Sequence, residues 1–542
     1  MQVSRTSPIA GRSIDSINGC VKYDAINPFD VPFGQLVYNK NMEYKFQNNR
    51  VYLETRAGSS VLFDNKYKCL GITSYVNGSD NTIVYVDSRG YLNYLASNNT
   101  EALIKELAKE NHKFVMFGTE TLSGLYGCNK IDGVYKVSSG LTYSAIANSP
   151  KLVDMVFSSI SGRLLGVKDH TIFWTEVQQL DAETLDNIET WNIVNNNARP
   201  TPDGGKGFCA VREDGQVIYF FKDTKILALT NSEEDVSQWR FPALKAIGVG
   251  SGETVRYVKY GNVNGFIYLA SDKTLRFLAP QIERNAGTLP TLYDDISHII
   301  SLNFQTYLDG INDLTKCNAY FYDNKYFLNI TENSADIVKT IVIDCEKLLP
   351  AQANQYAQPF WYETVNLDTN NYVVVDNKLY GTHIKGYILE MFNKDKYIDE
   401  VPARIGTDLT IDWSIVFGWM QLYTSSVEIL KLYLKWATDY NGPIKFYSNS
   451  FFIGNALPQF DNYTNAISVY PNTGSGGYEG QVIADIGLSS TLRNEMTTPI
   501  TPKAKGDYFV FGLFNNTPTQ RVIIYGFSPI LKSIKTNAIS RR

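Results

Sequence analysis

The chain has 542 residues, of which 44% are hydrophobic, 13% aromatic and only 19% charged. This aromatic-rich, charge-poor balance favours strands over helices and leaves ample apolar surface for a large core. The formal net charge is −5, and no run of Lys or Arg is long enough to follow a phosphate backbone. The composition therefore argues against tight, sequence-specific binding of nucleic acid.

Residues 1–63 open the chain without the repeat described below. Thr6 to Gly34 holds three prolines and several turn formers, which predicts an extended arm. For Met1 to Asn18 a partly disordered tail is the alternative. Gln35 to Phe63 alternates as strands do, and one of these strands is expected to complete the last unit of the array that follows. The N-terminal residues lack the apolar core of a signal peptide and no stretch is long enough to span a bilayer, so we expect folding in a cytoplasm.

From about residue 64 to 400 a β-hairpin recurs. Ser161 to Val177 reads as an apolar strand, a Lys-Asp-His turn and a second apolar strand closed by Trp174. Asp214 to Thr230 and Asn264 to Pro280 follow the same order. The glycines that begin these copies, Gly162, Gly215 and Gly265, come roughly every 50 residues, close to the period of β-propeller blades.

Weaker copies extend the series to about six or seven units. They are Asn81 to Ala96, Phe114 to Val137, Tyr320 to Asp344 and Asn371 to Phe392. One such hairpin is marginal in water, so its apolar faces must stack against neighbours. Radial stacking of four-stranded sheets meets this need, and the sequence predicts an all-β protein built on a β-propeller.

The array is interrupted at few places. Glu101 to Glu110 and Val177 to Trp191 have helical spacing and helix-forming residues. Asp181 to Gly207 reads as an insertion, and insertions in repeat arrays map to loops that commonly form the binding face. Three consecutive aromatic residues, Phe360 to Tyr362, are expected to pack in the core or between blades rather than to stack on a ligand.

After residue 400 the pattern changes to short strands in a stretch that is too short for three further blades. Seven alternating segments predict a β-sandwich-like domain over residues 401–542. The segments are Thr407–Phe417, Met420–Tyr423, Val427–Trp436, Gly442–Tyr447, Gln481–Ile486, Asp507–Phe514 and Gln520–Pro529. The Gly-rich loop Tyr470 to Gly480 lacks the GK[ST] ending of a phosphate loop, and we expect it to be exposed.

Catalytic signatures are missing from the sequence. The histidines His112, His170, His298 and His383 lie far apart, outside metal-ligand spacing, and His170 and His383 fall in predicted turns, where we expect solvated loop residues. The six cysteines are scattered without a CxxC, which predicts reduced, mostly buried thiols. No GxSxG, HExxH, Walker or Rossmann fingerprint is present. We therefore predict no enzyme activity, no catalytic residue, no cofactor and no metal site.

A glycosidase is the enzyme hypothesis to weigh, since a propeller funnel can hold two facing carboxylates. Five turn aspartates are available, but they recur once per unit, as turn chemistry alone requires. They are Asp87, Asp169, Asp223, Asp272 and Asp376. The Ser-x-Asp-x-Gly-x-Thr-Trp boxes of sialidase-type propellers and the Gly-His and Trp-Asp marks of WD repeats are absent, so we predict a structural role for these aspartates.

The chain resembles the tail nozzle and packaged-DNA stabilisation proteins of short-tailed bacteriophages. The resemblance rests on Ser7 to Arg12 leading to Arg56-Ala57-Gly58, on the hairpin from Gly162 to Glu176, and on Phe360-Trp361-Tyr362 in a late blade. It covers most of the chain in architecture, through motifs that are loosely specific. An abundance of Asn, Lys, Tyr and Ile agrees with a phage of a low-GC host.

The resemblance implies a structural virion protein of the tail, made in the cytoplasm of the bacterial host. Such proteins form a homo-oligomeric ring, usually of six copies, below the portal and adaptor, near tail fibres or tail-tip proteins. DNA is held in the channel and ejected through it without sequence-specific binding, and a weakly acidic wall lets a duplex slide. Asp181 to Gly207 and Tyr470 to Gly480 are the candidates for gate or partner contacts. A carbohydrate-binding or glycan-degrading tail propeller, or a plain interaction propeller, are the alternatives.

Overall fold

The protein is almost entirely β-structure in the computed structural model. Among the described residues the two α-helices, α1 (Asp186–Glu189) and α2 (Gln305–Asp309), are short, and no helix there is long and apolar enough to cross a membrane. The structure describes residues 8–17, 20, 33–47, 50–77, 80–96, 99–118, 123–178, 186–192, 197–201, 205–230, 232, 235–279, 282–283, 291–292, 297–331, 339–349, 358–418, 420–424, 426–438, 444–451, 467–469, 496–502, 504–515 and 521–534.

In the described part of the chain, seven antiparallel sheets or parts of sheets follow one another from residue 69 to 393, together with a two-stranded sheet of β24 (Ile282–Glu283) and β25 (Thr291–Leu292). The first three are β6 (Cys69–Asn77), β7 (Asp80–Asp87), β8 (Tyr91–Leu95) and β9 (Glu101–Glu106); β10 (Lys113–Gly118), β11 (Ser123–Asn129), β12 (Gly133–Val137) and β13 (Tyr143–Ala145); and β14 (Asp154–Ser158), β15 (Arg163–Lys168), β16 (Thr171–Trp174) and β17 (Ala198–Pro200). The next two are β18 (Phe208–Glu213), β19 (Ile218–Lys222) and β20 (Ile226–Leu229); and β21 (Arg256–Tyr260), β22 (Val263–Leu269), β23 (Leu275–Leu278) and β26 (Ser297–Ile299).

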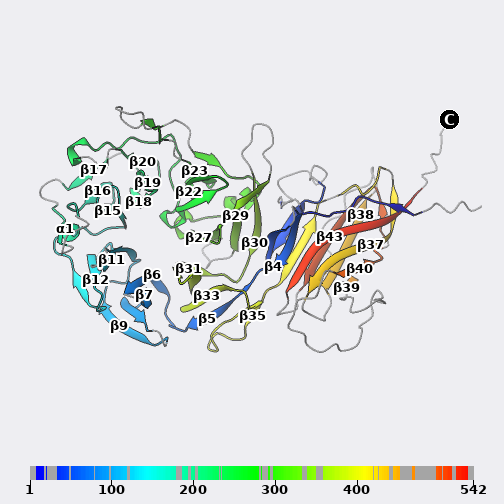
Figure 1. Ribbon diagram of the computed structural model, residues 1–542, viewed down its shortest axis with the longest axis horizontal. Coiled ribbons are helices and arrows are strands. Elements are labelled where there is room, and N and C mark those ends of the chain that lie inside the picture. The colour runs from blue at the N-terminus through cyan, green and yellow to red at the C-terminus, as the bar shows by residue number, and fades with distance from the viewer. Residues whose placement is uncertain are drawn as a thin grey trace, which may run out of the picture.

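The sixth sheet begins with β27 (Asn318–Tyr322), β28 (Lys325–Ile330), β29 (Lys339–Leu349) and β30 (Gln358–Thr364), and the seventh has β31 (Thr369–Val375), β32 (Lys378–His383) and β33 (Tyr387–Asn393). The first strands contact one another around a closed circuit, with β31 returning to β6 and the turn η5 (Gly252–Thr254) linking β18 to the fifth sheet. Figure 1 shows this ring. The arrangement is that of a β-propeller, and each of the seven predicted hairpins lies in a different sheet.

The ring is closed by a strand from the N-terminal part of the chain. β5 (Gly58–Phe63) pairs antiparallel with β33 and so becomes the outer strand of the seventh sheet. It also pairs in parallel with β34 (Ile398–Asp399), which in turn pairs with β35 (Leu409–Thr410). The expectation that an N-terminal strand completes the last unit is confirmed.

The remaining strands form two larger sheets beside the ring, which we call the two-sheet region (Figure 1). One sheet runs β3 (Met42–Gln47), β4 (Arg50–Thr55), β43 (Val522–Ser533), β37 (Val427–Thr438) and β40 (Met496–Ile500), with β1 (Ile9–Ala10) on β43 and β41 (Lys505–Gly506) on β37. The other runs β2 (Leu36–Lys40), β36 (Trp413–Phe417), β42 (Tyr508–Asn515), β38 (Ile444–Phe451) and β39 (Ile467–Val469), and it continues the sixth propeller sheet because β2 pairs with β30.

Aromatic rings hold the two sheets of this region face to face. Phe527 of β43 contacts Phe417, Phe446 and Phe511 of the facing sheet, with ring centroids 5.2 to 6.4 Å apart. Both N-terminal and C-terminal strands build the region, and one hydrophobic core cluster runs from the fifth, sixth and seventh propeller sheets into it. The two parts of the molecule therefore share a core.

Several predicted elements differ from the structure. The helix expected over Glu101 to Glu110 is wrong: Glu101–Glu106 is the strand β9, because pairing with β8 outweighs the helix propensity of its residues. Of the helix expected over Val177 to Trp191 only one turn, α1, lies in the described part. Met420 makes an isolated bridge to Phe509 rather than beginning a strand. Gln481–Ile486 lies outside the described residues.

Candidate functional site: the junction between propeller and two-sheet region

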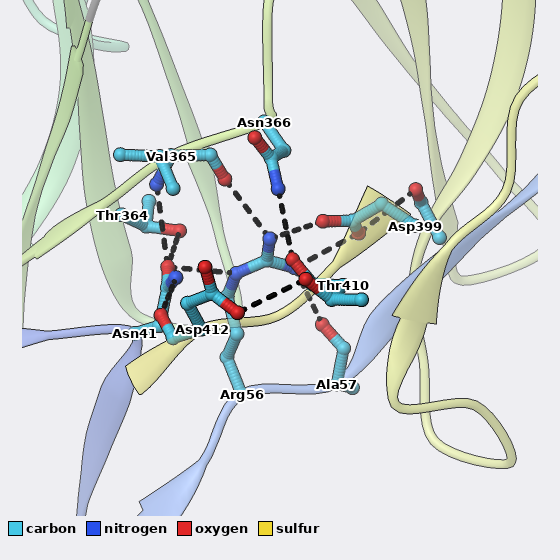
Figure 2. Close-up of polar contacts among 10 residues, drawn as sticks. Asn41, Arg56, Ala57, Thr364, Val365, Asn366, Asp399, Thr410 and Asp412 are labelled. Carbon is cyan, nitrogen blue, oxygen red and sulfur yellow. Dashed lines mark hydrogen bonds and ion pairs between the residues drawn. The ribbon is translucent and has the colours of Figure 1, made fainter. Parts of the chain in front are cut away.

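A single buried arginine lies where the ring meets the two-sheet region. The side chain of Arg56, between β4 and β5, is fully buried. Its Nη1 donates to Asp399 Oδ1 and to the Ala57 carbonyl, each at 3.0 Å, and its Nη2 donates to Asp399 Oδ2 and, at 2.9 Å, to the Val365 carbonyl. Figure 2 shows this fork of donors. Because Asp399 lies on β34 and Val365 follows β30, one side chain ties three segments together.

Asn41 is the second centre of the junction. Its Oδ1 accepts from Arg56 Nε at 3.2 Å, from Thr364 Oγ1 at 2.7 Å and from the Val365 amide at 3.2 Å. Its Nδ2 donates to the Asp412 carbonyl at 2.6 Å (Figure 2). Asn41 joins β2 to β3 with a φ of 58°, a conformation that asparagine tolerates better than most residues. It thereby fixes the turn of the two-sheet region against the last propeller sheets.

The residues after Arg56 pass through a very narrow space. A Cβ atom on Gly58 would lie 1.9 Å from the carbonyl oxygen of Ile398, so only glycine fits there. The Gly58 amide donates to the Lys396 carbonyl at 2.7 Å, and Ser59 Oγ donates to Asp399 Oδ1 at 3.1 Å. The sequence Arg56-Ala57-Gly58, on which part of the family resemblance rests, is the crossing point between the two parts of the molecule.

Electrostatics explains why Arg56 can be buried. Burial by itself would lower the pKa of the Arg56 guanidinium, but the charge and hydrogen bonds of Asp399 outweigh it and raise the pKa. A buried charge is tolerated only when it is paired and hydrogen-bonded, and both conditions hold here. We interpret it as a structural ion pair, because the N–H groups of Arg56 already have acceptors and the carboxylate of Asp399 already accepts from Arg56 and Ser59.

A cavity of about 800 Å³ lies beside the junction, between β3, β4 and the sixth and seventh propeller sheets. Glu43 of β3 accepts from Lys45 Nζ of the same strand at 2.7 Å, and it lies 3.5 Å from Lys325 Nζ of β28, across the two parts. Burial alone would raise the pKa of Glu43, but Lys325 and Lys45 lower it to about 2. The Glu43–Lys325 ion pair thus adds a second charged contact between the two parts.

Ion pairs also join different sheets of the ring. Lys113 of β10 pairs with Glu253 of η5, and Arg212 Nη1 of β18 lies 2.5 Å from Asp154 Oδ2 of β14. Burial would raise the pKa of Glu253, but Lys113, Arg256 and Arg212 lower it to about 2. The interior carboxylates named here face cations rather than each other, which differs from the facing pair of acids that glycoside hydrolysis needs.

The turn aspartates stabilise local structure. Asp87 is buried and accepts from the Arg89 amide at 2.8 Å, and Asp272 accepts from the Thr274 amide at 3.0 Å, as the turn hypothesis requires. Asp223 accepts from the Lys206 amide at 2.9 Å. Asp169 and Asp376 each occupy a turn position with a φ of 49°. The five aspartates lie in separate hairpins, and the hydrogen bonds described here do not join any two of them.

The histidines lie apart, and one of them differs from expectation. His383 is buried rather than solvated: its Nδ1 accepts from the Lys385 amide at 3.1 Å and its ring stacks on Tyr387. Burial, followed by Lys385 and Arg404, lowers its pKa to about 3. His170 is half-buried, with Nδ1 3.4 Å from Lys222 Nζ. Within the described part of the chain, no three His, Cys, Asp or Glu side chains form a group that could hold a metal ion.

The other predicted features pack in the interior. Phe360, Trp361 and Tyr362 are at most 5% exposed, and Phe360 contacts the rings of Tyr44 and Phe46, which confirms core packing. All six cysteines are free thiols, and five of them are buried. Sequence reasoning missed the junction because its residues are far apart in the chain, with Arg56-Ala57-Gly58 as the one local signal.

The two candidate loops are described only in part or not at all. Of Asp181 to Gly207, α1 packs beside the second sheet, where Tyr126 Oη donates to Glu189 Oε1 at 3.0 Å, and Ala198–Pro200 is the outer strand of the third sheet. Tyr470 to Gly480 lies outside the described residues.

No protein-family model matches this chain, and no curated protein matches it. The solved structures that it resembles include the computationally designed Ika8 protein, at 11% identity and a TM-score of 0.33, and U3-55K, at 8% identity and a TM-score of 0.34. Each comparison covers 61% of this chain and 97% of the other. Both are WD40-like β-propeller proteins, while the fold assigned here rests on the strand pairing described above.

Proposed function

We propose that this protein is a structural virion protein of a short-tailed bacteriophage: a tail nozzle subunit that forms a ring of six copies below the portal and adaptor. The ring retains packaged DNA and forms the channel for its ejection. In this proposal the seven-bladed propeller is a rigid wedge, and the N-terminal arm and the two-sheet region make contacts between subunits, to neighbouring rings and to tail fibres or tail-tip proteins.

The Arg56 junction is the observation that carries the proposal. A ring subunit that holds pressurised DNA has to keep its parts in fixed relative positions, and a flexible linker between them would not. Here the connection is a shared sheet, a shared core and a buried, fully hydrogen-bonded ion pair. The same tripeptide, Arg56-Ala57-Gly58, belongs to the motifs through which the chain resembles the nozzle proteins.

Charge supports the same role for the channel wall. The net charge of −5 gives a ring of copies no overall attraction for DNA, so a duplex would pass without sticking. The proposal involves no catalysis and no cofactor.

Negative-stain imaging tests the proposal. The full chain is imaged alone and after mixing with the portal and adaptor assembly of the phage that encodes it, and size-exclusion chromatography with light scattering gives the mass. A ring with a central channel of duplex width, formed alone or on the adaptor, is expected. A monomer that does not bind the adaptor contradicts the proposal, and glycan-array binding and hydrolysis then test the carbohydrate-binding alternative.

A further inference from the structure

A polar cavity of about 340 Å³ opens at one mouth of the propeller axis. It lies where the first strands of the propeller sheets begin: Lys68 precedes β6, Lys113 begins β10, and Lys316 precedes β27. Its lining consists of Lys68, Leu70, Asn111, Lys113, Glu253, Thr315, Lys316, Cys317, Asn318, Thr331, Asn370, Asn371 and Ile384. Residues far apart in the sequence therefore converge on one small space.

The lining carries an excess of positive charge, with three lysines and one carboxylate. Glu253 is already paired with Lys113. The side chains of Lys68 and Lys316 make no ion pair, and that of Asn111 makes no hydrogen bond, with any residue that the structure describes. Two ammonium groups and one amide are thus available at the mouth.

The surroundings reinforce this charge. Lys151 and Lys206 stand just before β14 and β18, so the starts of two more first strands add cations around the axis. One acid close by is Asp313, whose carboxylate accepts from the amide and hydroxyl of Thr315. Those hydrogen bonds, and after them Lys316 and Lys206, lower the pKa of Asp313. A local basic surface in a chain with a net charge of −5 marks a place for an anion.

The lining also narrows the class of ligand. It offers ammonium, amide and hydroxyl groups, and none of its described residues is aromatic, so it lacks the platform on which a base or a sugar ring stacks. The volume is that of a small-molecule site. Ammonium and amide donors around a small cavity are suited to phosphate or carboxylate oxygens.

We propose that this cavity binds a small oxyanion, a phosphate or carboxylate group, through Lys68, Lys316 and Asn111. The group belongs either to a free small molecule or to the anionic end of a larger one. Nothing in the proposed nozzle role requires this site, so each of the two proposals can be tested and contradicted independently of the other.

Isothermal titration calorimetry of the full chain with inorganic phosphate, at constant ionic strength, tests the site. We expect saturable binding with one site per chain and a Kd that rises at least tenfold in the double variant Lys68→Gln, Lys316→Gln. Both lysines are exposed, so the variant is expected to fold. The matched control Lys130→Gln, Lys431→Gln removes the same charge at exposed positions outside the lining and should bind as the parent does.

Two results overturn the proposal: no saturable binding of phosphate, or equal binding by the double variant and the parent. A second titration series with glucose 6-phosphate and glucuronate separates the sources of the group. Tighter binding of glucose 6-phosphate than of phosphate supports a free phosphorylated molecule. Equal binding of all three supports recognition of the anionic end alone. These titrations use the chain without portal or adaptor, so they do not depend on ring formation.

Discussion

Arg56 is the residue on which the junction depends most, since its guanidinium donates to five oxygen atoms of four residues, Asn41, Ala57, Val365 and Asp399. Arg56→Ala leaves the carboxylate of Asp399 buried with Ser59 as a remaining donor. Removing one partner of a buried ion pair typically costs about 3–5 kcal/mol. We expect a loss of this size in the free energy of unfolding, measured by chemical denaturation.

Two variants give this measurement its controls. Arg50→Ala removes an exposed arginine from the start of β4 and should change stability by less than about 0.5 kcal/mol. Arg56→Lys keeps the charge but lacks the planar fork, so it should fall between Arg56→Ala and the parent. A loss below about 1 kcal/mol for Arg56→Ala would show that the junction contributes little.

Glu43 makes stability depend on pH. Its pKa is about 2 in the folded protein, below the ordinary value of 4.5, because Lys325 and Lys45 outweigh burial. The ion pair therefore stabilises the fold above pH 4.5, and this contribution is lost as the pH falls from about 4.5 to 2. At roughly 1.4 kcal/mol per pKa unit the contribution is of the order of 3 kcal/mol.

Denaturation of the parent and of Glu43→Gln at several pH values tests this. The parent should be more stable at pH 6, and the difference should shrink toward zero as the pH approaches 2. The control Glu346→Gln, in an exposed pair with Lys347, should show no such convergence. A difference that stays constant with pH would exclude Glu43 as the titrating group.

At the scale of elements, β5 closes the propeller and depends on Gly58. A methyl group at this position would meet the Ile398 carbonyl, so Gly58→Ala has to move β5 away from β34 or β33. Overpacking of this kind costs typically about 1–3 kcal/mol. We expect a lower unfolding midpoint and faster amide hydrogen exchange across β5 and β33.

The control for this variant is Gly140→Ala, where the nearest atom to the added Cβ would be Ser138 Oγ at 4.0 Å. It should leave both the midpoint and the exchange rates unchanged. Equal exchange in β5 for Gly58→Ala and the parent would mean that the strand tolerates the added atom without moving.

The elements also explain what could be predicted from sequence. The hairpins were predictable because their signal is local: apolar strands around turns such as that of Asp272, which bonds its own backbone. The strand β9 could not be predicted, because its sequence EALIKE has helix-forming residues and only pairing with β8 makes it a strand. His383 was expected in a solvated turn, but Tyr387 and the neighbouring chain bury it.

Apart from Arg56-Ala57-Gly58, local sequence patterns could predict neither the junction nor the polar cavity at the mouth of the propeller axis. Arg56 and Asp399 are 343 positions apart, and no spacing rule joins them. The sequence has no run of basic residues, yet the ring brings Lys68, Lys113 and Lys316 to one cavity. The finding that no run of Lys or Arg could follow a phosphate backbone concerns only consecutive basic residues. A propeller, in contrast, assembles its sites from strands that begin far apart in the chain.

At the scale of the whole molecule, the shared core predicts a single cooperative unfolding transition. The nine-stranded sheet and one core cluster run through both parts, and Glu43 with Lys325 pairs across them, so neither part can unfold without exposing the interior of the other. Trp174 and Trp239, in contact within the propeller, report on one part, and the buried Trp413 and Trp436 report on the other. With 5-fluorotryptophan incorporated, ¹⁹F NMR in a denaturant series should give the same midpoint for all four.

Arg56→Ala sharpens this prediction. If the junction couples the two parts, the variant lowers the midpoints of the propeller and two-sheet reporters together; if the parts are independent domains, the reporters separate already in the parent. Separate midpoints would contradict the rigid connection on which the proposed nozzle role rests, because a subunit whose parts unfold independently cannot transmit force from one ring to the next.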